Sequence, residues 1–190
     1  SGQTIYTIIA NDDVAVTSYA IADTDASLLS VNSSTGVVSL IADPDYETKN
    51  SYSFTVTASD AAGNTSDATS VSFSINDINE SPVAVADTAT VAEDASLTSI
   101  DVITNDTDVE GDTLTLTAVT TAGSGTVAIN GVSVDYTPAA DFNGTEEITY
   151  TVSDGTLTDE GTLTITVTPE NDAPVAVADT ATVAEDASLT

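Results

Sequence analysis

The sequence predicts an all-β protein built from Greek-key β-sandwiches in tandem, as a linear array. Turn-forming residues recur every 8–12 positions, and the short segments between them alternate apolar with polar residues. The run PVAVADTATVAEDASLT fills residues 82–98 and returns unchanged at 174–190. The two copies start at residues 82 and 174, 92 residues apart, so the repeating unit has the size of a domain.

The first domain is expected over residues 1–80, without its first strand. Its strands, rich in Val, Ile, Thr and Tyr, are expected at 4–10, 15–21, 37–41, 51–58 and 69–75. The second domain is expected over 81–172, with strands at 83–91, 96–103, 113–120, 125–129, 132–137, 146–153 and 161–168. Asn130-Gly131, between two alternating segments, predicts a hairpin with a type I′ turn. Residues 173–190 are expected to begin a third repeat with its first strand.

The chain is strongly acidic, with 31 Asp and Glu against a single cation, Lys49, and a formal charge of −30. Nucleic acid is excluded as a partner because phosphate binding needs clustered Lys and Arg. No apolar run approaches the ~18 residues of a membrane span, so direct membrane insertion is not expected. The acidic side chains repel one another, and bound cations would offset that repulsion.

The side chains available also argue against an enzyme. The sequence contains no His and no Cys, so nucleophilic triads of the usual kinds are unavailable. Carboxylate pairs can hydrolyse glycosides, but the acids here gather at the predicted domain ends, with no aromatic cleft beside them.

Acidic and amide residues recur where the domains join. Ca²⁺ takes six to eight oxygen ligands, chiefly from carboxylates, amides and carbonyls. The candidates at the first joint are Asp45, Glu47, Asp77, Asn79, Glu80, Asp106, Asp108 and Asp154. The Asp106-x-Asp108 spacing resembles the start of an EF-hand loop, but the closing glutamate is missing. The alternative is that these acids are solvated turn residues, since Asp and Asn favour turns.

Residues 2–80 resemble a cadherin repeat. The segments that carry this resemblance, in the order of the family, are Ala10-Asn11-Asp12, Tyr19-Ala20-Ile21, Thr35-Gly36-Val37-Val38, Asp45-Tyr46-Glu47, residues 52–60 and Asp77-Ile78-Asn79-Glu80. Residues 82–172 resemble the cadherin-like repeats found in tandem in large bacterial surface adhesins of the type I-secreted (RTX) kind. The segments in this case are Ala92-Glu93-Asp94, Asn105-Asp106-Thr107-Asp108, Tyr136-Thr137-Pro138 and residues 150–155. The resemblance implies cadherin/immunoglobulin-like sandwiches.

The resemblance also implies Ca²⁺ at each joint. At the first joint it adds the carbonyl oxygens of Ile78 and Ser81, and Glu80 stands where the family usually has Asp. At the second joint it implies Glu93, Asp141, Asn171 and Asp172, although Pro169 replaces the first linker aspartate. Asp12 and Asp60 would face a joint before the first domain.

These inferences predict an extracellular, cell-surface module: a calcium-binding spacer that stiffens a repetitive bacterial adhesin, as in biofilms. Its partners would be calcium and the neighbouring repeats of the same chain. The alternative is a ligand-binding module that contacts glycans or another cadherin-like chain. A further hypothesis is head-to-tail self-association, in which residues 174–190 of one chain pair with the open first domain of the next and build filaments. Glu185 would then supply the glutamate that the first domain lacks.

Overall fold

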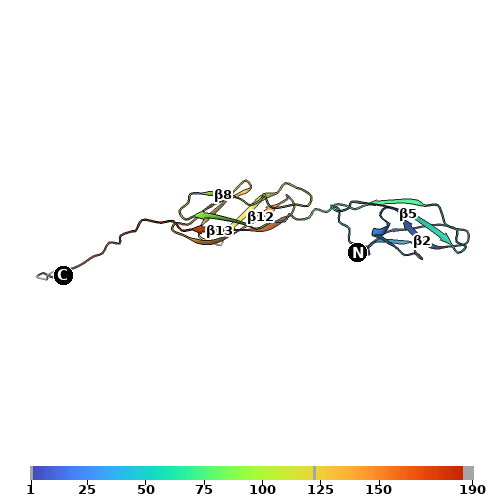
Figure 1. Cartoon of the computed structure of the whole chain (residues 1–190), viewed down its shortest axis with the longest axis horizontal. Helices are drawn as coiled ribbons and strands as arrows, with labels where there is room; N and C mark the ends of the chain where they lie inside the picture. The colour runs from blue at the N-terminus through green and yellow to red at the C-terminus, as the bar shows by residue number, and fades with distance from the viewer. Residues whose placement is uncertain (1, 122, 186–190) are drawn as a thin grey trace. The chain divides into compact units, whose positions relative to one another are not determined.

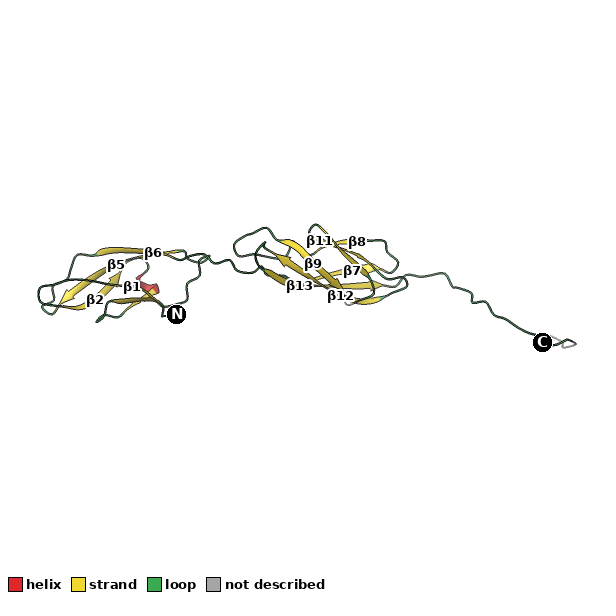
Figure 2. Cartoon of the chain, turned by 180° about the vertical axis from the view of Figure 1, so that it is seen from behind, coloured by secondary structure: helices red, strands yellow, loops and turns green. Residues whose placement is uncertain are grey.

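The computed structural model describes residues 2–121 and 123–185, whose regular secondary structure is almost entirely β-strand (Figure 1, Figure 2). The predicted all-β fold class is confirmed. Within the described ranges the one helical segment is η1 (Ala26–Leu28), a single 3-10 turn drawn in red in Figure 2. The chain divides into two compact units, unit 1 ending at Glu80 and unit 2 beginning at Ser81.

Unit 1 consists of two three-stranded antiparallel sheets around one core. The first sheet has the order β1 (Thr4–Thr7), β4 (Val37–Leu40) and β3 (Leu29–Val31), and the second has the order β2 (Val16–Ala22), β5 (Ser51–Asp60) and β6 (Thr69–Ser74). Successive side chains of a strand point to opposite faces. Phe54 and Val56 of β5 therefore face the core, where they cluster with Val38 and Leu40 of the other sheet.

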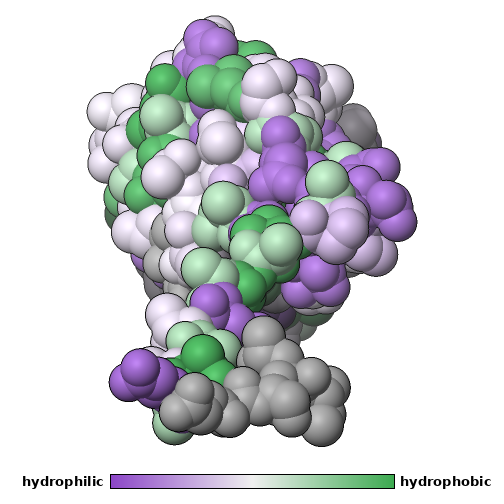
Figure 3. All heavy atoms as spheres, turned by 90° about the vertical axis from the view of Figure 1, so that its left-hand side faces the viewer, coloured by the Kyte–Doolittle hydropathy of each residue, from purple (hydrophilic) through white to green (hydrophobic). Residues whose placement is uncertain are grey.

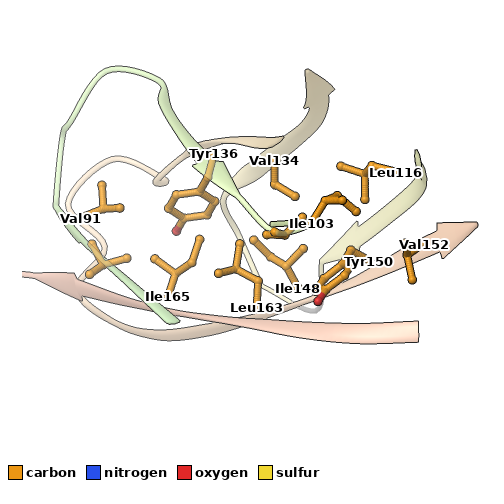
Figure 4. Close-up of a cluster of buried hydrophobic side chains, with 12 residues drawn as sticks. Val91, Ile103, Leu116, Val134, Tyr136, Ile148, Tyr150, Val152, Leu163 and Ile165 are labelled. Atoms are coloured by element: carbon orange, nitrogen blue, oxygen red, sulfur yellow. The ribbon is translucent and has the colours of Figure 1, made fainter. Parts of the chain in front are cut away.

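Unit 2 has a three-stranded and a four-stranded sheet. The first has the order β10 (Thr126–Asn130), β11 (Ser133–Thr137) and β8 (Thr98–Asp101), and the second has the order β7 (Asp87–Ala92), β13 (Thr158–Thr168), β12 (Gly144–Ser153) and β9 (Thr115–Thr121). Strand β7 pairs with β13 in parallel, and the other pairs are antiparallel. Figure 4 shows the core between the sheets, where Tyr136 of β11 faces Ile165 and Leu163 of β13.

Each of the twelve strands expected in the first two domains is present with shifted ends, and one further strand forms. That strand is β3, whose three residues are too few to show an alternating pattern. The largest shift is at the predicted strand 83–91, which begins only at Asp87.

The predicted type I′ turn at Asn130-Gly131 is wrong. Asn130 pairs with Ser133, so Gly131 and Val132 form the two-residue loop. Positive φ occurs at Gly131 (64°) and not at Val132. Glycine at the first central position is the requirement of a type II′ turn, which also matches the strand twist.

The two copies of the repeated run have different structures. Residues 87–92 form β7, whereas residues 174–184 form no strand and their side chains are exposed. The strand expected to open a third repeat is therefore absent up to Glu185, and residues 186–190 lie outside the described ranges. A strand needs a neighbouring edge to satisfy its backbone N–H and C=O groups, and residues 174–184 have none in this structure.

Candidate metal sites

Asp106, in the loop between β8 and β9, carries a buried carboxylate. Its Oδ1 accepts hydrogen bonds from the backbone N–H of Val85 at 2.7 Å and from the Tyr150 hydroxyl at 3.3 Å. The residue is 9% exposed, and its Oδ2 is buried without a hydrogen-bond partner. Leaving a buried charged oxygen unsatisfied costs free energy, and a bound cation would remove that cost.

Two further carboxylates lie around Asp106. Asp87 accepts hydrogen bonds from the Tyr150 hydroxyl at 3.2 Å and from the Asn105 amide at 2.9 Å. Asp159 accepts one from the backbone N–H of Ala84 at 2.9 Å. The Tyr150 hydroxyl also lies 2.8 Å from the carbonyl oxygen of Val85, yet its single proton can serve only one of these acceptors at a time.

The pKa values of Asp106 and Asp87 are raised, as expected where carboxylates have too few hydrogen-bond donors. Burial raises the pKa of Asp106, and the charges of Asp87 and Asp159 raise it further, against the hydrogen bonds from Val85 and Tyr150. Burial is also the main cause of the raised pKa of Asp87. Unit 2 contains no Lys or Arg that could neutralise the group.

Asp108 has the second unsatisfied oxygen of this loop. Its Oδ1 accepts the backbone N–H of Asp112 at 3.0 Å, while its Oδ2 is buried without a hydrogen-bond partner. Asp154 has another role, because its Oδ1 accepts the N–H groups of Thr156 and Leu157 and so holds the turn between β12 and β13. The unsatisfied oxygens of Asp106 and Asp108 fit a hard cation such as Ca²⁺, which prefers carboxylate oxygen.

A second acidic group lies where unit 2 ends. Carboxylate oxygens of Asp94, Asp141 and Asp172 lie within 4.8 Å of one another, and all three residues are exposed. The backbone N–H of Asp141 donates to Asp94 at 3.2 Å, and both residues adopt left-handed backbone angles. The pKa of Asp172 is raised, first by desolvation and then by the charges of Asp94, Asp141, Glu93 and Glu170.

Glu93 is buried at this end of unit 2 and connects its segments through hydrogen bonds. The residue is 5% exposed, and it accepts the backbone N–H of Glu170 at 2.7 Å and the Asn143 amide at 3.0 Å. The structure thus brings together three residues predicted for the second joint, Glu93, Asp141 and Asp172. The fourth, Asn171, donates its amide to the carbonyl of Asp172 at 3.4 Å.

Unit 1 places its predicted ligands in two regions. Oxygens of Glu47 and Asp77 lie within 4.8 Å of each other. Asp45 is engaged by the backbone and hydroxyl groups of Thr48, whose hydrogen bonds lower the pKa of Asp45. In the linker, Asn79 donates its amide to the carbonyl of Glu80 at 2.8 Å, and Ile78 is exposed.

Asp12 and Asp60 lie apart from that group and line one pocket together with Asn11 and Asn64. Asp12 accepts the backbone N–H groups of Val14 and Ala15. Asp60 accepts the backbone and amide groups of Asn64, which lower its pKa.

Sequence reasoning missed Asp87, Asp94, Asp159 and Tyr150 as members of these groups. Asp94 directly follows the predicted Glu93 and belongs to the same motif, so its position was a usable signal. Asp87 and Asp159 come near Asp106 only through the pairing of β7, β12 and β13, which no local pattern indicates.

The chain's one cation does not offset these acids. Lys49 pairs with Asp25 of unit 1 at 3.0 Å and lies over the ring of Tyr52. The face drawn in Figure 3 shows hydrophilic residues, in purple, gathered mainly on one side of the surface.

Residues 79–166 match the family model of the bacterial Ig domain. The match begins in the linker and covers most of unit 2, including the Asp106 loop. The similarity to the bacterial Ig domain therefore concerns unit 2 and the linker before it, and not the strands of unit 1. A search of curated proteins gave no match.

Solved cadherin structures share the fold over both units. EC1-2 of human protocadherin-24 aligns with a TM-score of 0.63 and 18% identity, covering 88% of this chain and 90% of that one. PcdhgB3 EC1-4 aligns with a TM-score of 0.61 and 20% identity, over 90% of this chain and 45% of that one. EC22-24 of mouse cadherin-23 aligns with a TM-score of 0.56 and 20% identity, over 89% and 59%. In the part of the chain that the structure describes, no helix is long and apolar enough to span a membrane.

Proposed function

We propose that this chain is a calcium-binding, extracellular spacer or adhesion module without enzymatic activity. The observation that carries the proposal is the buried Oδ2 of Asp106, which lacks a hydrogen-bond partner beside the carboxylates of Asp87 and Asp159. A calcium ion would be held by Asp106 and Asp108 at the start of unit 2. Its charge would replace the donors that Tyr150 and Asn105 cannot supply.

The acidic groups at the other ends of the units extend the proposal to the joints between repeats. Asp94, Asp141 and Asp172 gather where unit 2 ends, and Glu47 and Asp77 lie close together within unit 1. Without a cation these carboxylates repel one another and leave the linkers mobile. A bound calcium ion would attract these carboxylates and offset their mutual repulsion, so each joint would stiffen. A rod that holds an adhesive tip away from a cell surface requires such stiff joints.

The match to the bacterial Ig domain and the cadherin-like fold support an adhesion module on a bacterial surface. Sites of extracellular modules bind Ca²⁺ with dissociation constants of ~10⁻⁴–10⁻³ M. We expect affinities in that range, so the joints would be loaded in calcium-rich surroundings and empty where calcium is scarce.

Isothermal titration calorimetry with CaCl₂ tests the binding, and small-angle X-ray scattering tests the stiffening. The wild-type chain should bind calcium and its maximum dimension should rise on loading. Asp108→Asn should lose binding at the Asp106 loop, and Asp77→Ala should reduce the calcium-dependent change in scattering. Glu147→Gln is the matched control, because Glu147 is an exposed acid in the middle of β12. Equal calcium binding by wild type and Asp108→Asn would refute the site.

A further inference from the structure

Unit 1 carries an open groove on the outer face of the sheet formed by β2, β5 and β6 (Figure 2). Its volume is about 370 Å³, which lies within the ~300–1,000 Å³ of small-molecule sites. The turn after β2 forms one side of the groove, and β5 and β6 form its floor. The outward-facing residues that line it all have short polar side chains: Asp23, Thr24, Ser53, Thr55, Ser70 and Ser72.

The floor of the groove is a regular array of hydroxyl groups. Ser53 of β5 lies beside Ser72 of β6, and Thr55 lies beside Ser70. Residues directly opposite on antiparallel strands have Cβ atoms ~4.5–5.5 Å apart, and residues two apart along one strand are separated by ~7 Å. These four groups, called the floor hydroxyls below, therefore cover an area comparable with that of one sugar ring.

The turn that forms the side of the groove is held firmly on β5. Asp25 is 6% exposed, and its Oδ2 accepts the backbone N–H of Ser53 at 2.7 Å. The N–H of Asp25 donates in turn to the carbonyl of Ser53 at 3.2 Å. Lys49, the one cation of the chain, pairs with the Asp25 carboxylate at 3.0 Å. A site whose walls are fixed before binding loses less conformational entropy when its ligand arrives.

Asp23 supplies the one charged side chain of the groove lining. Its backbone is left-handed, with a φ of 72°, and glycine adopts such angles at lower cost. The turn by itself therefore does not require an aspartate at this position. Across residues 2–121 and 123–185, no group donates a hydrogen bond to the Asp23 carboxylate or bonds to the floor hydroxyls. These polar atoms are available to a ligand.

The chemistry of the lining selects the class of ligand. Hydroxyls both donate and accept hydrogen bonds, and a carboxylate accepts several, which complements a molecule with many hydroxyl groups of its own. Anions are repelled by Asp23 and by the charge of −30 on the chain. Ca²⁺ takes six to eight oxygens, chiefly from carboxylates, and the groove offers one carboxylate. Apolar ligands find no aromatic surface, because Phe54 beneath the groove is 2% exposed.

We propose that this groove of unit 1 binds a neutral saccharide. The Asp23 carboxylate accepts hydrogen bonds from two adjacent hydroxyl groups of the sugar, and the floor hydroxyls bind the others. The dissociation constant is expected in the millimolar range, because each neutral hydrogen bond replaces one to water and no aromatic ring stacks on the sugar. The binding is independent of calcium, since the lining shares no residue with the acidic groups described above.

Amide NMR spectra of the whole chain, titrated with the methyl glycosides of glucose, galactose and mannose, test the binding. At least one of the three sugars should shift the amide signals of residues 23–24, 53–55 and 70–72, equally in calcium and in chelator. The methyl uronide of the sugar that binds should cause smaller shifts, because its carboxylate is repelled by Asp23. No shifts at these residues with any of the three sugars, or binding that requires calcium, would overturn the proposal.

Two variants with matched controls test the residues, and the same spectra show whether each variant is folded. Asp23→Asn keeps a side chain that tolerates left-handed angles and removes the charge, so affinity should fall ~10-fold or more. Asp13→Asn, at an exposed aspartate outside the groove, should bind as wild type does. Ser72→Ala removes one floor hydroxyl and should weaken binding ~2–10-fold. Ser74→Ala, at the next outward position of β6, should leave it unchanged. Wild-type affinity in both Asp23→Asn and Ser72→Ala would refute the site.

Discussion

The hydroxyl of Tyr136 donates a 2.8 Å hydrogen bond to Oε2 of Glu146 inside the core of unit 2. Tyr136 belongs to β11 and Glu146 to β12, so the bond links the two sheets across the sandwich. Glu146 is 3% exposed, and its Oε1 also accepts the backbone N–H groups of Ser124 and Gly125. A carboxylate without a cationic partner is thus tolerated in the core because hydrogen-bond donors surround it.

Removing the hydroxyl should therefore destabilise unit 2. Tyr136→Phe removes this donor from Oε2 of Glu146, which keeps a longer contact of 3.3 Å to the N–H of Gly125. A buried charged acceptor that loses a donor costs ~1–3 kcal/mol. Urea unfolding should show a decrease of that size in the free energy of unfolding. Tyr6→Phe, at a partly exposed tyrosine of unit 1, should change it by less than ~0.5 kcal/mol.

The same carboxyl should make unit 2 sensitive to acid. Burial tends to raise the pKa of Glu146, but the hydrogen bonds from Tyr136, Ser124 and Gly125 outweigh burial and lower it below 4.5. A lowered folded-state pKa contributes stability above the unfolded-state value, and that stability is lost as the pH falls through the folded-state value. Unfolding free energies measured from pH 7 to pH 3 should fall more steeply for wild type than for Glu146→Gln. Parallel curves would contradict this role.

Asp106 should contribute a pH dependence of stability opposite in sign to that of Glu146. Its raised pKa means that folding is opposed by its charge above the folded-state pKa and relieved as the pH falls. Asp106→Asn removes that charge and keeps an oxygen for the N–H of Val85. In chelator the variant should be at least as stable as wild type. In calcium it should lose the rise of ~2.7 kcal/mol that one site gives at 100-fold its dissociation constant. Thermal unfolding with and without calcium measures both effects, with Glu147→Gln as control.

Substitution of Gly161, which packs against Tyr150, should also destabilise unit 2. A Cβ at Gly161 would overlap the ring and hydroxyl of Tyr150, which occupy the space beside this β13 residue. Gly161→Ala should destabilise unit 2 by ~1–3 kcal/mol through overpacking. Because the displaced hydroxyl contacts Asp87 and Asp106, calcium binding at the Asp106 loop should change as well. Thr162→Ala, on the exposed face of β13, should alter neither quantity.

Much of the fold and part of each acidic group could be predicted from local sequence. The alternation in residues 146–153 and 161–168 identifies β12 and β13, because each strand buries every second residue against one core. Glu93, Asp141 and Asp172 were predicted together and lie together. The three residues of β3 were missed because their pairing with β4, rather than any pattern of their own, makes them a strand.

Which acids are buried was decided by the tertiary structure alone. Asp106 and Asp154 look alike in sequence, each an aspartate in a turn-rich segment. Asp154 is satisfied by its own turn, through the N–H groups of Thr156 and Leu157. Asp106 instead faces Tyr150 and Val85, far along the chain, and is left with an unsatisfied oxygen.

The repeated run shows most clearly what the sequence determines and what the tertiary structure decides. The sequence alone determined that DTATVA is suited to a strand, with Val at an inward position and threonines outward. It could not determine whether that strand forms. Residues 87–92 form β7 because the edge of β13 supplies their hydrogen-bond partners and the core buries Val91. Residues 179–184 have the same side chains and no such edge, so water satisfies their backbone, because a β-strand is stabilised by its neighbours and not by its own residues.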